Sequence, residues 1–404
     1  MSVSTTKLWQ GYRLMPRSLE LLPRSLVSSR FTQRQCISTN TRLVVRSLAP
    51  DPVAGIHNIN IEPMDKPDIL TLPKEAVVVK VSHCAVHWVD CLMMAGQYQQ
   101  APPLPYTPGM EYSGTVVDVA ADCKEFVVGD SVFVADPVNA GPRSYGQYQQ
   151  YGGMATYTVA PQIAVRKIPE NLTFGEAATL SGAYETAYHA LIHCARIKEG
   201  EVALVHGATG ATGLAAVQIC SAMGVNIIIT GGTDEKLDVV EKQCLGEGKV
   251  IGRHNYNSDS NLVKDVKSAV KAVDIVYDTV GGLELGKNSL RVLKFGGRYC
   301  IVGWTSTPFA GGGRGAGADH ATANVLPTNL IMMKGAQVLG CPMAIHTNLD
   351  PSIRVPRVET IDRMVKDGLV KPYVSHQFKL SDAKDALLAK WNRKIIGGCV
   401  IDCN

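Results

Sequence analysis

The pattern of hydrophobic and polar positions changes along the chain and divides it into regions. Between residues 52 and 172, Val-rich or alternating runs are separated by Gly, Pro and Asp, which is typical of short β-strands. Four such runs are EAVVVKVSHCAV, YSGTVVDVA, DSVFVA and MATYTVAP. We therefore predict an all-β domain with a barrel-like sheet in this region.

From residue 173 to 345, apolar runs typical of buried strands alternate with segments of helical periodicity, which predicts an α/β fold with a parallel, doubly wound sheet. The predicted strands are EVALVHGA, VNIIITGG, KVIG, VDIVYDTV and GGRYCIVG, and GLAAVQICSAMG is one of the helical segments. Residues 346–404 contain two amphipathic helices, VETIDRMVKDGLVK and LSDAKDALLAKW, and a closing strand, GGCVID.

The first 46 residues differ from the rest of the chain in charge. Within residues 1–50, eight basic residues stand against Glu20 alone, a net of +7, which leaves −3 for the remainder because the formal charge is +4. The segment is rich in Ser and Thr, and its Leu and Arg residues could lie on opposite faces of a helix. We predict a transit peptide for the mitochondrial matrix, cleaved between Arg34 and Arg46; the alternative is a disordered leader on a cytoplasmic protein.

Composition disfavours several classes of function. No apolar run reaches the roughly 18 residues that a membrane span requires. The net charge outside the leader indicates no basic surface for nucleic acid, so a small-molecule substrate is the expected partner. The eleven cysteines form no C-x-x-C pair and no regular framework, so we expect reduced thiols.

The clearest chemical signal is VALVHGATGATGLAAVQ, in which Gly207, Gly210 and Gly213 recur at every third residue. These glycines lie where a predicted strand turns into a predicted helix. Missing side chains there permit a tight turn, let a pyrophosphate approach the backbone and leave the helix N-terminal N–H groups accessible. Because the turn lies within a run of βα units, it predicts a dinucleotide site rather than an ordinary turn.

The end of the next strand favours NADPH over NADH. NAD-binding enzymes usually place an acidic residue about 20 residues after the glycine turn, but residues 230–232 are Thr-Gly-Gly. The acids that follow, Asp234 and Glu235, are expected in the first turn of a helix, where capping and the helix dipole favour them. Lys236 could then contact the 2′-phosphate, and Tyr256 could add a hydroxyl; a solvated helix face is the alternative for the lysine.

From about residue 75 to the C-terminus the chain resembles a known family. The matching segments include PPLPYTPGMEYSGTVVDVA, VALVHGATGATGLAAVQIC, LKFGGRYCIVG and GLVKPYVSHQFKLSDAKDAL, in the family's order. The family is the zinc-independent quinone oxidoreductases, of the zeta-crystallin type, in the medium-chain dehydrogenase/reductase superfamily. The resemblance implies a GroES-like β-barrel domain completed by the C-terminal segment, a Rossmann domain that binds NADPH in the cleft, and a homodimer. It implies a cofactor site formed by Thr186, Gly207, Gly210, Ala211, Thr212, Gly213, Gly232, Lys236, Tyr256, Thr279, Gly303 and Trp304.

The zinc ligands of the related alcohol dehydrogenases are not expected here. Met110 occupies the position of a zinc-binding histidine, and Gly182 falls where a third ligand would be. No cysteine occurs between Cys123 and Cys194, where a structural zinc would need a cluster of four. We therefore predict no metal at either zinc site.

The stretch AVHWVDCLMMAGQY places His87 where the family usually has Asn, while Asp90 matches the family's Asp. A histidine keeps a hydrogen-bonding group and adds one that titrates; simple packing is an equal alternative. A metal held by His87 with Cys84 and Cys91 would need a shared helix, which the predicted strand end at Cys84 opposes.

The implied reaction is hydride transfer to a quinone or another conjugated carbonyl. Negative charge then develops on the acceptor oxygen, and the predicted catalytic residues are His87 and Tyr98, as donors, with Asp90. An enoyl-thioester or alkenal reductase is a rival, which Leu92 disfavours because some relatives have tyrosine there; a non-catalytic NADPH-binding or structural protein is another. The glycine-dense segment around Arg314 is interpreted as a surface loop, with attraction of an anionic substrate as the alternative.

Overall fold

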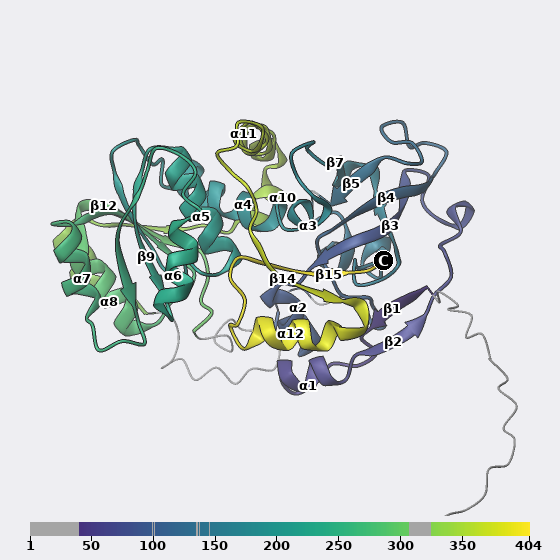
Figure 1. Cartoon of the computed structure of the whole chain (residues 1–404), viewed down its shortest axis with the longest axis horizontal. Helices are drawn as coiled ribbons and strands as arrows, with labels where there is room; N and C mark the ends of the chain where they lie inside the picture. Colours follow the sequence, from purple (N-terminus) through teal and green to yellow (C-terminus); the bar gives the residue numbers. More distant parts are fainter. Residues whose placement is uncertain are drawn as a thin grey trace, which may run out of the picture. The chain divides into compact units, whose positions relative to one another are not determined.

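Two large β-sheets and a two-stranded ribbon form the framework of the protein (Figure 1). The computed structural model describes residues 40–98, 100, 102–134, 136, 138–144, 146–306 and 325–404. One large sheet is mostly antiparallel, and the other is parallel with helices packed on it. The predicted α/β fold class, with a barrel-like sheet and a doubly wound sheet, is confirmed.

The antiparallel sheet contains every strand predicted in the first region. Its strand order is β14-β15-β3-β4-β5-β7, with β6 also paired to β3. The central strand is the Val-rich run of β3, which pairs with strands along both of its edges and whose valines are buried on both faces. The strands are β3 (Ala76–Ala85), β4 (Tyr112–Val119), β5 (Ser131–Val134), β6 (Tyr157–Pro161), β7 (Val165–Lys167), β14 (Val374–Lys379) and β15 (Gly398–Asp402).

The parallel sheet has the order β10-β9-β8-β11-β12-β13, in which β8 is followed outward by β9 and β10 on one side. The chain then returns to the other side of β8 and continues through β11, β12 and β13. This reversal leaves a crevice at the carboxyl ends of β8 and β11, where ligands bind in open α/β sheets. The strands are β8 (Val202–Val205), β9 (Asn226–Gly231), β10 (Val250–Asn255), β11 (Val273–Asp278), β12 (Leu293–Ile301) and β13 (Gln337–Gly340).

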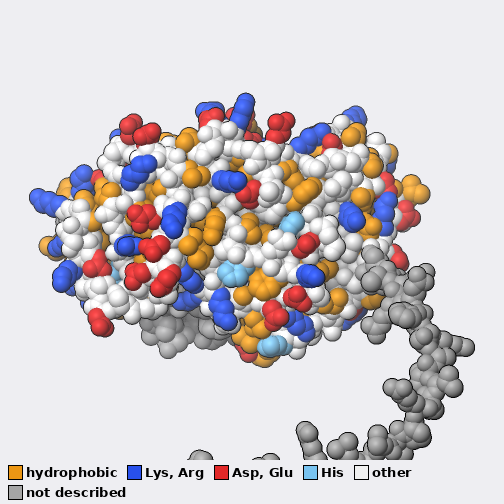
Figure 2. All heavy atoms as spheres, viewed as in Figure 1, with side chains coloured by type: hydrophobic (Ala, Val, Ile, Leu, Met, Phe, Trp, Pro, Cys, Tyr) orange, Lys and Arg blue, Asp and Glu red, His pale blue; other side chains and the backbone are white. Residues whose placement is uncertain are grey.

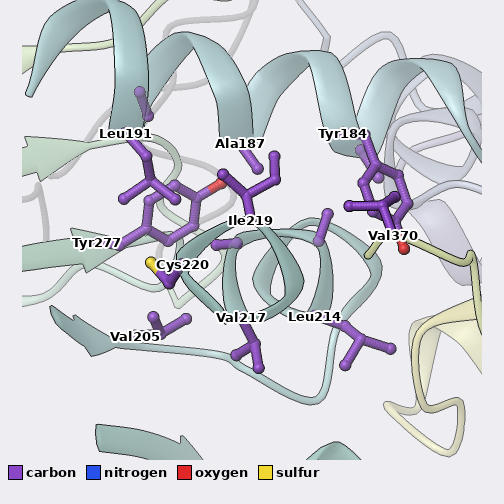
Figure 3. Close-up of a cluster of buried hydrophobic side chains, with 14 of the residues drawn as sticks. Tyr184, Ala187, Leu191, Val205, Leu214, Val217, Ile219, Cys220, Tyr277 and Val370 are labelled. Carbon is purple, nitrogen blue, oxygen red and sulfur yellow. The ribbon is translucent and has the colours of Figure 1, made fainter. Parts of the chain in front are cut away.

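The helix that follows the glycine turn, α5 (Ala211–Ala222), is buried on nearly every side. Figure 3 shows Leu191 above it, with Val205 and Tyr277 on the side of the sheet. A helix that is apolar all round is expected in such a position. The other helices against this sheet or beside α5 are α4 (Ser181–Tyr188) with its π-helical continuation η5 (His189–Cys194), α6 (Asp234–Glu241), α7 (Leu262–Ala269), α8 (Leu283–Val292), α9 (Thr328–Lys334), α10 (Met343–Leu349) and α11 (Arg354–Lys366).

The C-terminal segment returns to the antiparallel sheet, as predicted. There β15 lies between β14 and β3 and pairs antiparallel with β3. Just before β15, the N–H of Gly397 donates to the carbonyl of Thr209 at 2.9 Å, so the same segment also contacts the glycine turn. The helices around the antiparallel sheet are α1 (Pro52–His57), α2 (Trp88–Met94), α3 (Phe174–Ala178) and α12 (Ala383–Trp391).

The structure departs from two predicted boundaries. The folded unit begins at Thr39, and β1 (Thr41–Val44) pairs with β2 (Asn60–Pro63), although residues 41–46 were predicted to belong to the leader. The basic residues there suggested a leader, but Leu43 is fully buried and Arg46 points outward to Glu62 at 2.7 Å. Likewise α3 packs on β3 and β4 rather than on the parallel sheet, although it follows the boundary predicted at residue 173.

The described surface shows mixed charge. On the face in Figure 2, Lys and Arg side chains are interspersed with Asp and Glu. No helix in the described ranges is long and apolar enough to cross a membrane. All ten cysteines that the structure describes are free thiols, which agrees with the sequence prediction of reduced cysteines.

The burial of β1 gives a test of the revised boundary. We expect Leu43→Ala to lower the free energy of unfolding by about 2–5 kcal/mol, because it opens a cavity in the core. Leu70→Ala is the matched control, since Leu70 is 90% exposed, and should change stability by less than about 0.5 kcal/mol. Urea unfolding monitored by tryptophan fluorescence measures both. If the two variants are equally stable, residues 41–46 would be assigned to the leader, as the sequence predicted.

Candidate functional site

The glycine turn between β8 and α5 has the geometry that the sequence predicted. A Cβ added to Gly213 would stand 2.1 Å from the carbonyl oxygen of Gly207, so the helix approaches the turn as closely as the backbone allows. Gly207 has a φ of +66°, and its own added Cβ would stand 2.6 Å from Thr279 Oγ1. Gly210 caps α5 without a side chain, which leaves the first N–H groups of the helix available to an anion. The turn therefore fits a pyrophosphate.

The structure places the other predicted cofactor residues around this turn. Because the strands are parallel, their carboxyl ends lie at one edge of the sheet. Thr186 lies on α4, which packs against α5, and Ala211 and Thr212 open α5. The remaining residues follow successive strands: Gly207 after β8, Gly232 and Lys236 after β9, Tyr256 after β10, Thr279 after β11, and Gly303 and Trp304 after β12.

The edge of the crevice after β9 is free of acidic residues at positions 230–232, and the two acids that follow belong to a helix. Thr233 caps α6 by accepting from the N–H of Lys236 at 3.4 Å, with Asp234 and Glu235 in the first turn, as predicted. Lys236 Nζ donates to the carbonyl of Arg393 at 2.5 Å, and its partial burial lowers the pKa of Lys236. The ammonium is thus held at this edge rather than free on a helix face.

Asp90 positions the turn that carries His87. Its Oδ2 accepts the backbone N–H of His87 at 2.8 Å, and its Oδ1 accepts the N–H of Gly109 at 3.3 Å. Asp90 is 1% exposed, and burial raises the pKa of its carboxyl group. Cys84 lies on β3 and Cys91 on α2, so the two cysteines do not share a helix, as predicted. Both oxygens of Asp90 accept from backbone amides and hold the backbone around His87, while its catalytic role stays a prediction.

His87 faces Glu111, a residue to which the sequence analysis assigned no role. His87 Nε2 lies 2.8 Å from Glu111 Oε2, and the two side chains are only 18% and 2% exposed. Burial by itself lowers the pKa of His87, but the charge of Glu111 and contact with it outweigh that effect, and the net shift is upward. The signal that could have revealed this pair is an acid flanked by apolar residues at the start of a buried strand, where a carboxylate needs a partner.

Glu111 also contacts Gly182, the residue at the position where zinc-dependent relatives would have a third zinc ligand. Its Oε1 accepts the backbone N–H of Gly182 on α4. A Cβ added to Gly182 would stand 2.5 Å from that oxygen, so a larger residue there would require the Glu111 carboxylate to move. Met110 beside it packs in the core and is 4% exposed. The potential metal ligands around His87 therefore include the carboxylate of Glu111, which already accepts a hydrogen bond from the Gly182 backbone.

The C-terminal helix contributes residues to the same region, which the sequence analysis also missed. The rings of Trp88 on α2 and Trp391 on α12 stack with centroids 4.3 Å apart. Burial lowers the pKa of the neighbouring Lys390, whose ammonium is close enough to His87 and Asp90 to influence their titration. Lys390 of α12 thus adds a positive charge near His87.

Two predicted features lie outside this cluster. The ring of Tyr98 is covered by Arg143, whose Cζ is 5.7 Å from the ring centroid. In the part of the chain that the structure describes, no recorded contact joins Tyr98 to His87 or Glu111. Its role as a donor stays a prediction. Arg314 lies outside the described residues.

Comparisons with known proteins agree with this architecture. Residues 73–170 match the family described as Alcohol dehydrogenase GroES-like domain, and residues 211–351 match the family described as Zinc-binding dehydrogenase. The chain is 30% identical over 365 residues to Quinone oxidoreductase-like protein 2 of Rattus norvegicus, which covers 90% of this chain and 89% of the relative. It is 36% identical over 316 residues to Quinone oxidoreductase of Homo sapiens, with 78% and 85% covered.

Solved structures share the fold at lower identity. An NAD-dependent alcohol dehydrogenase superposes with a TM-score of 0.70 and 22% identity, over 90% of this chain and 99% of that one. A mycobacterial protein complexed with NADPH superposes with a TM-score of 0.69 and 21% identity, over the same shares. Since one of these proteins is described with NAD and the other with NADPH, the fold does not decide between the two cofactors.

The close packing of the glycine turn predicts the effect of one methyl group. Gly213→Ala should weaken NADPH binding by at least about tenfold, roughly 1.4 kcal/mol, because the turn must move away from the phosphates. Titration monitored by tryptophan fluorescence measures the affinity. Gly340→Ala is the matched control, since a Cβ at the end of β13 would meet no heavy atom within 4 Å. Unchanged affinity in Gly213→Ala would place the nucleotide elsewhere.

Proposed function

Because the chain belongs to the quinone oxidoreductase family of the medium-chain dehydrogenase/reductase superfamily, we propose that it is an NADPH-dependent reductase that transfers hydride to quinones or related conjugated carbonyls without zinc. Membership makes the protein an oxidoreductase with a nicotinamide cofactor. The observation that carries the finer proposal is the buried His87–Glu111 pair at the point where zinc-dependent relatives hold their metal.

The donor set supports a site without zinc. Catalytic zinc sites use three protein ligands and keep one open position. Here Glu111 already accepts from Gly182, and glycine at position 182 has no side chain that could bind a metal. A methionine at position 110 offers only a weak thioether donor. His87 and Glu111 therefore serve better as an ion pair for acid–base chemistry than as a set of metal ligands.

The site can stabilise a developing oxyanion. When bound, the nicotinamide supplies a hydride to an electron-poor carbon of the acceptor. Negative charge then grows on the acceptor oxygen and must be met by a donor. His87 Nε2 lies 2.8 Å from Glu111 Oε2, and 18% of the His87 side chain is exposed, which leaves the ring accessible to an acceptor. Glu111 holds the ring as an imidazolium, and the imidazolium donates the proton that completes reduction.

The preference for NADPH is supported by charge at the edge of the crevice. Positions 230–232 carry no carboxylate that would repel a 2′-phosphate. Lys236 lies directly beyond them, held by the carbonyl of Arg393, and the exposed Tyr256 follows the neighbouring strand. Both groups can donate to a phosphate.

The proposal predicts a pH-dependent quinone reductase. The full-length protein should oxidise NADPH in the presence of ortho- or para-quinones, measured by loss of NADPH absorbance, and should use NADH poorly. Its kcat should fall as pH rises through the raised pKa of His87, because only the imidazolium donates a proton. His87→Leu should lower kcat by roughly 100-fold. His87→Asn keeps a donor, so it should be more active than His87→Leu but lose this pH dependence.

Two further variants sharpen that experiment. Glu111→Gln keeps an oxygen for the Gly182 N–H but removes the charge, so the fall in kcat should move to lower pH. His57→Asn, at an exposed histidine on α1, is the control and should leave the profile unchanged. A profile in His87→Asn identical to that of the wild type would remove His87 from the mechanism. Faster turnover of enoyl thioesters than of quinones would favour an enoyl-thioester reductase. NADPH binding without turnover of any acceptor would favour a non-catalytic role.

We also propose that the protein is delivered to the mitochondrial matrix, and a homodimer remains the expected assembly. The support for delivery is the basic, Ser- and Thr-rich segment before the folded unit, which begins at Thr39. Isolated mitochondria with a membrane potential should import and shorten the full-length chain. Replacing Arg13, Arg17 and Arg24 by Glu should abolish import, because the charge of the segment is reversed. If these substitutions leave import unchanged, the result would favour a cytoplasmic location of the protein.

A further inference from the structure

Three histidines from two distant segments meet beside α4. His189 and His193 lie on the π-helix η5, and His346 lies on α10. Each offers a ring nitrogen, and these nitrogens all lie within 4.8 Å of one another. It is the one such grouping of three potential ligands among the residues that the structure describes. We propose that His189, His193 and His346 bind a divalent transition metal ion, and that the ion is zinc.

The buried member of the group has a nitrogen without a partner. His189 is 0% exposed, and its Nδ1 makes no hydrogen bond with any described residue. A buried polar nitrogen without a partner is unfavourable, and native proteins rarely leave one. Its Nε2 lies 3.6 Å from the sulfur of Cys194. A metal bound at the free nitrogen would satisfy the ring, whereas packing alone would not.

The backbone directs the three rings toward one point. His189 and His193 are four residues apart, and their rings are stacked with centroids 4.9 Å apart. The ring of His346 meets both of them edge-on, with centroids 5.1 Å away in each case. The segment is π-helical, and π-helical turns occur frequently at functional sites. Three imidazoles that approach from two directions can surround one face of an ion.

The distances and flexibility suit a zinc ion. Zinc binds imidazole nitrogens at about 2.0–2.1 Å, which in a tetrahedron separates neighbouring nitrogens by about 3.3 Å. The rings must therefore close by up to about 1.5 Å relative to the 4.8 Å limit. His193 is exposed and His346 is half-buried, so both side chains can rotate while the buried His189 stays in place. Imidazole is a ligand that zinc and its neighbours in the first transition row accept.

The surrounding charges are compatible with a cation. Arg357 is a buried positive group in this part of the fold, and it forms an ion pair with Glu185 at 2.7 Å. Asp350, at the end of α10, acts electrostatically on both His193 and His346 and lies on the solvent side. The fourth position is open to water or to the Asp350 carboxylate.

The site would connect two parts of the fold that face the proposed active site. The π-helix continues α4, which carries Gly182 and Thr186, while α10 follows the edge strand β13. An ion held by both segments would fix α4 against α10, and with it the N–H that binds Glu111. Binding should therefore raise thermal stability, because the ion binds only the folded arrangement.

The test measures zinc binding to the full-length protein after treatment with a chelator, with no nucleotide or quinone present. Isothermal titration with ZnCl2 should show a site of one ion per chain, with a rise in melting temperature. His193→Ala and His346→Ala should each weaken zinc binding by more than roughly 100-fold. That is the upper end of the cost of removing a residue that only hydrogen-bonds to a metal ligand. His57→Ala, an exposed histidine on another helix, is the matched control and should bind like the wild type.

Cobalt distinguishes this site from competing ones. Co2+ bound by three imidazoles should give the visible absorption bands of tetrahedral coordination. The charge-transfer band of a thiolate ligand should be absent, because such a band would indicate binding by Cys194 or Cys341. His87→Asn should bind the ion normally, so the result is independent of the proposed reductase activity. Absence of binding, or binding that survives both His193→Ala and His346→Ala, would overturn the proposal and leave the three rings as aromatic packing.

Discussion

The pairing of β15 with β3 is the constraint on which the rest of the structure depends. The last strand of the chain inserts beside one of the first, so everything between them must leave the antiparallel sheet, build the parallel sheet and return. The return places Gly397 on the glycine turn, where its N–H donates to the carbonyl of Thr209 at 2.9 Å. It also places Arg393 against Lys236. The backbone from Arg393 to β15 therefore contributes both to the antiparallel sheet and to the edge of the crevice in the parallel sheet.

A single buried carboxylate makes a second connection between the two halves. Glu111 accepts from Gly182 on the side of α4 and faces His87 on the side of α2. A buried carboxylate without partners would be strongly unfavourable, so both contacts stabilise the fold. In surroundings of low dielectric constant, the same charge holds a proton on His87. In the proposed function, that proton takes the part that a metal ion plays in zinc-dependent relatives.

The elements that were predicted well are those whose signals are local. The valines of β3, the apolar runs of the parallel sheet and the cap at Thr233 each specify structure within a few residues. The elements that were missed depend on distant partners. The residues of β1 looked like a leader because arginines flank them, and only their pairing with β2 shows that Leu43 is core. Glu111 and Lys390 acquire a place in the site because strands and helices far apart in the sequence pack together.

The sequence by itself determined the two kinds of sheet, the glycine turn and the lack of an acid at positions 230–232, because periodicity and side-chain size act between near neighbours. Only the tertiary structure decided which polar groups meet. The partner of His87, the carbonyl that holds Lys236 and the convergence of His189 with His346 all join segments that the chain separates widely. The physical reason is that burial makes an unpaired polar group unfavourable, while the packing of sheets and helices determines which partner is within reach.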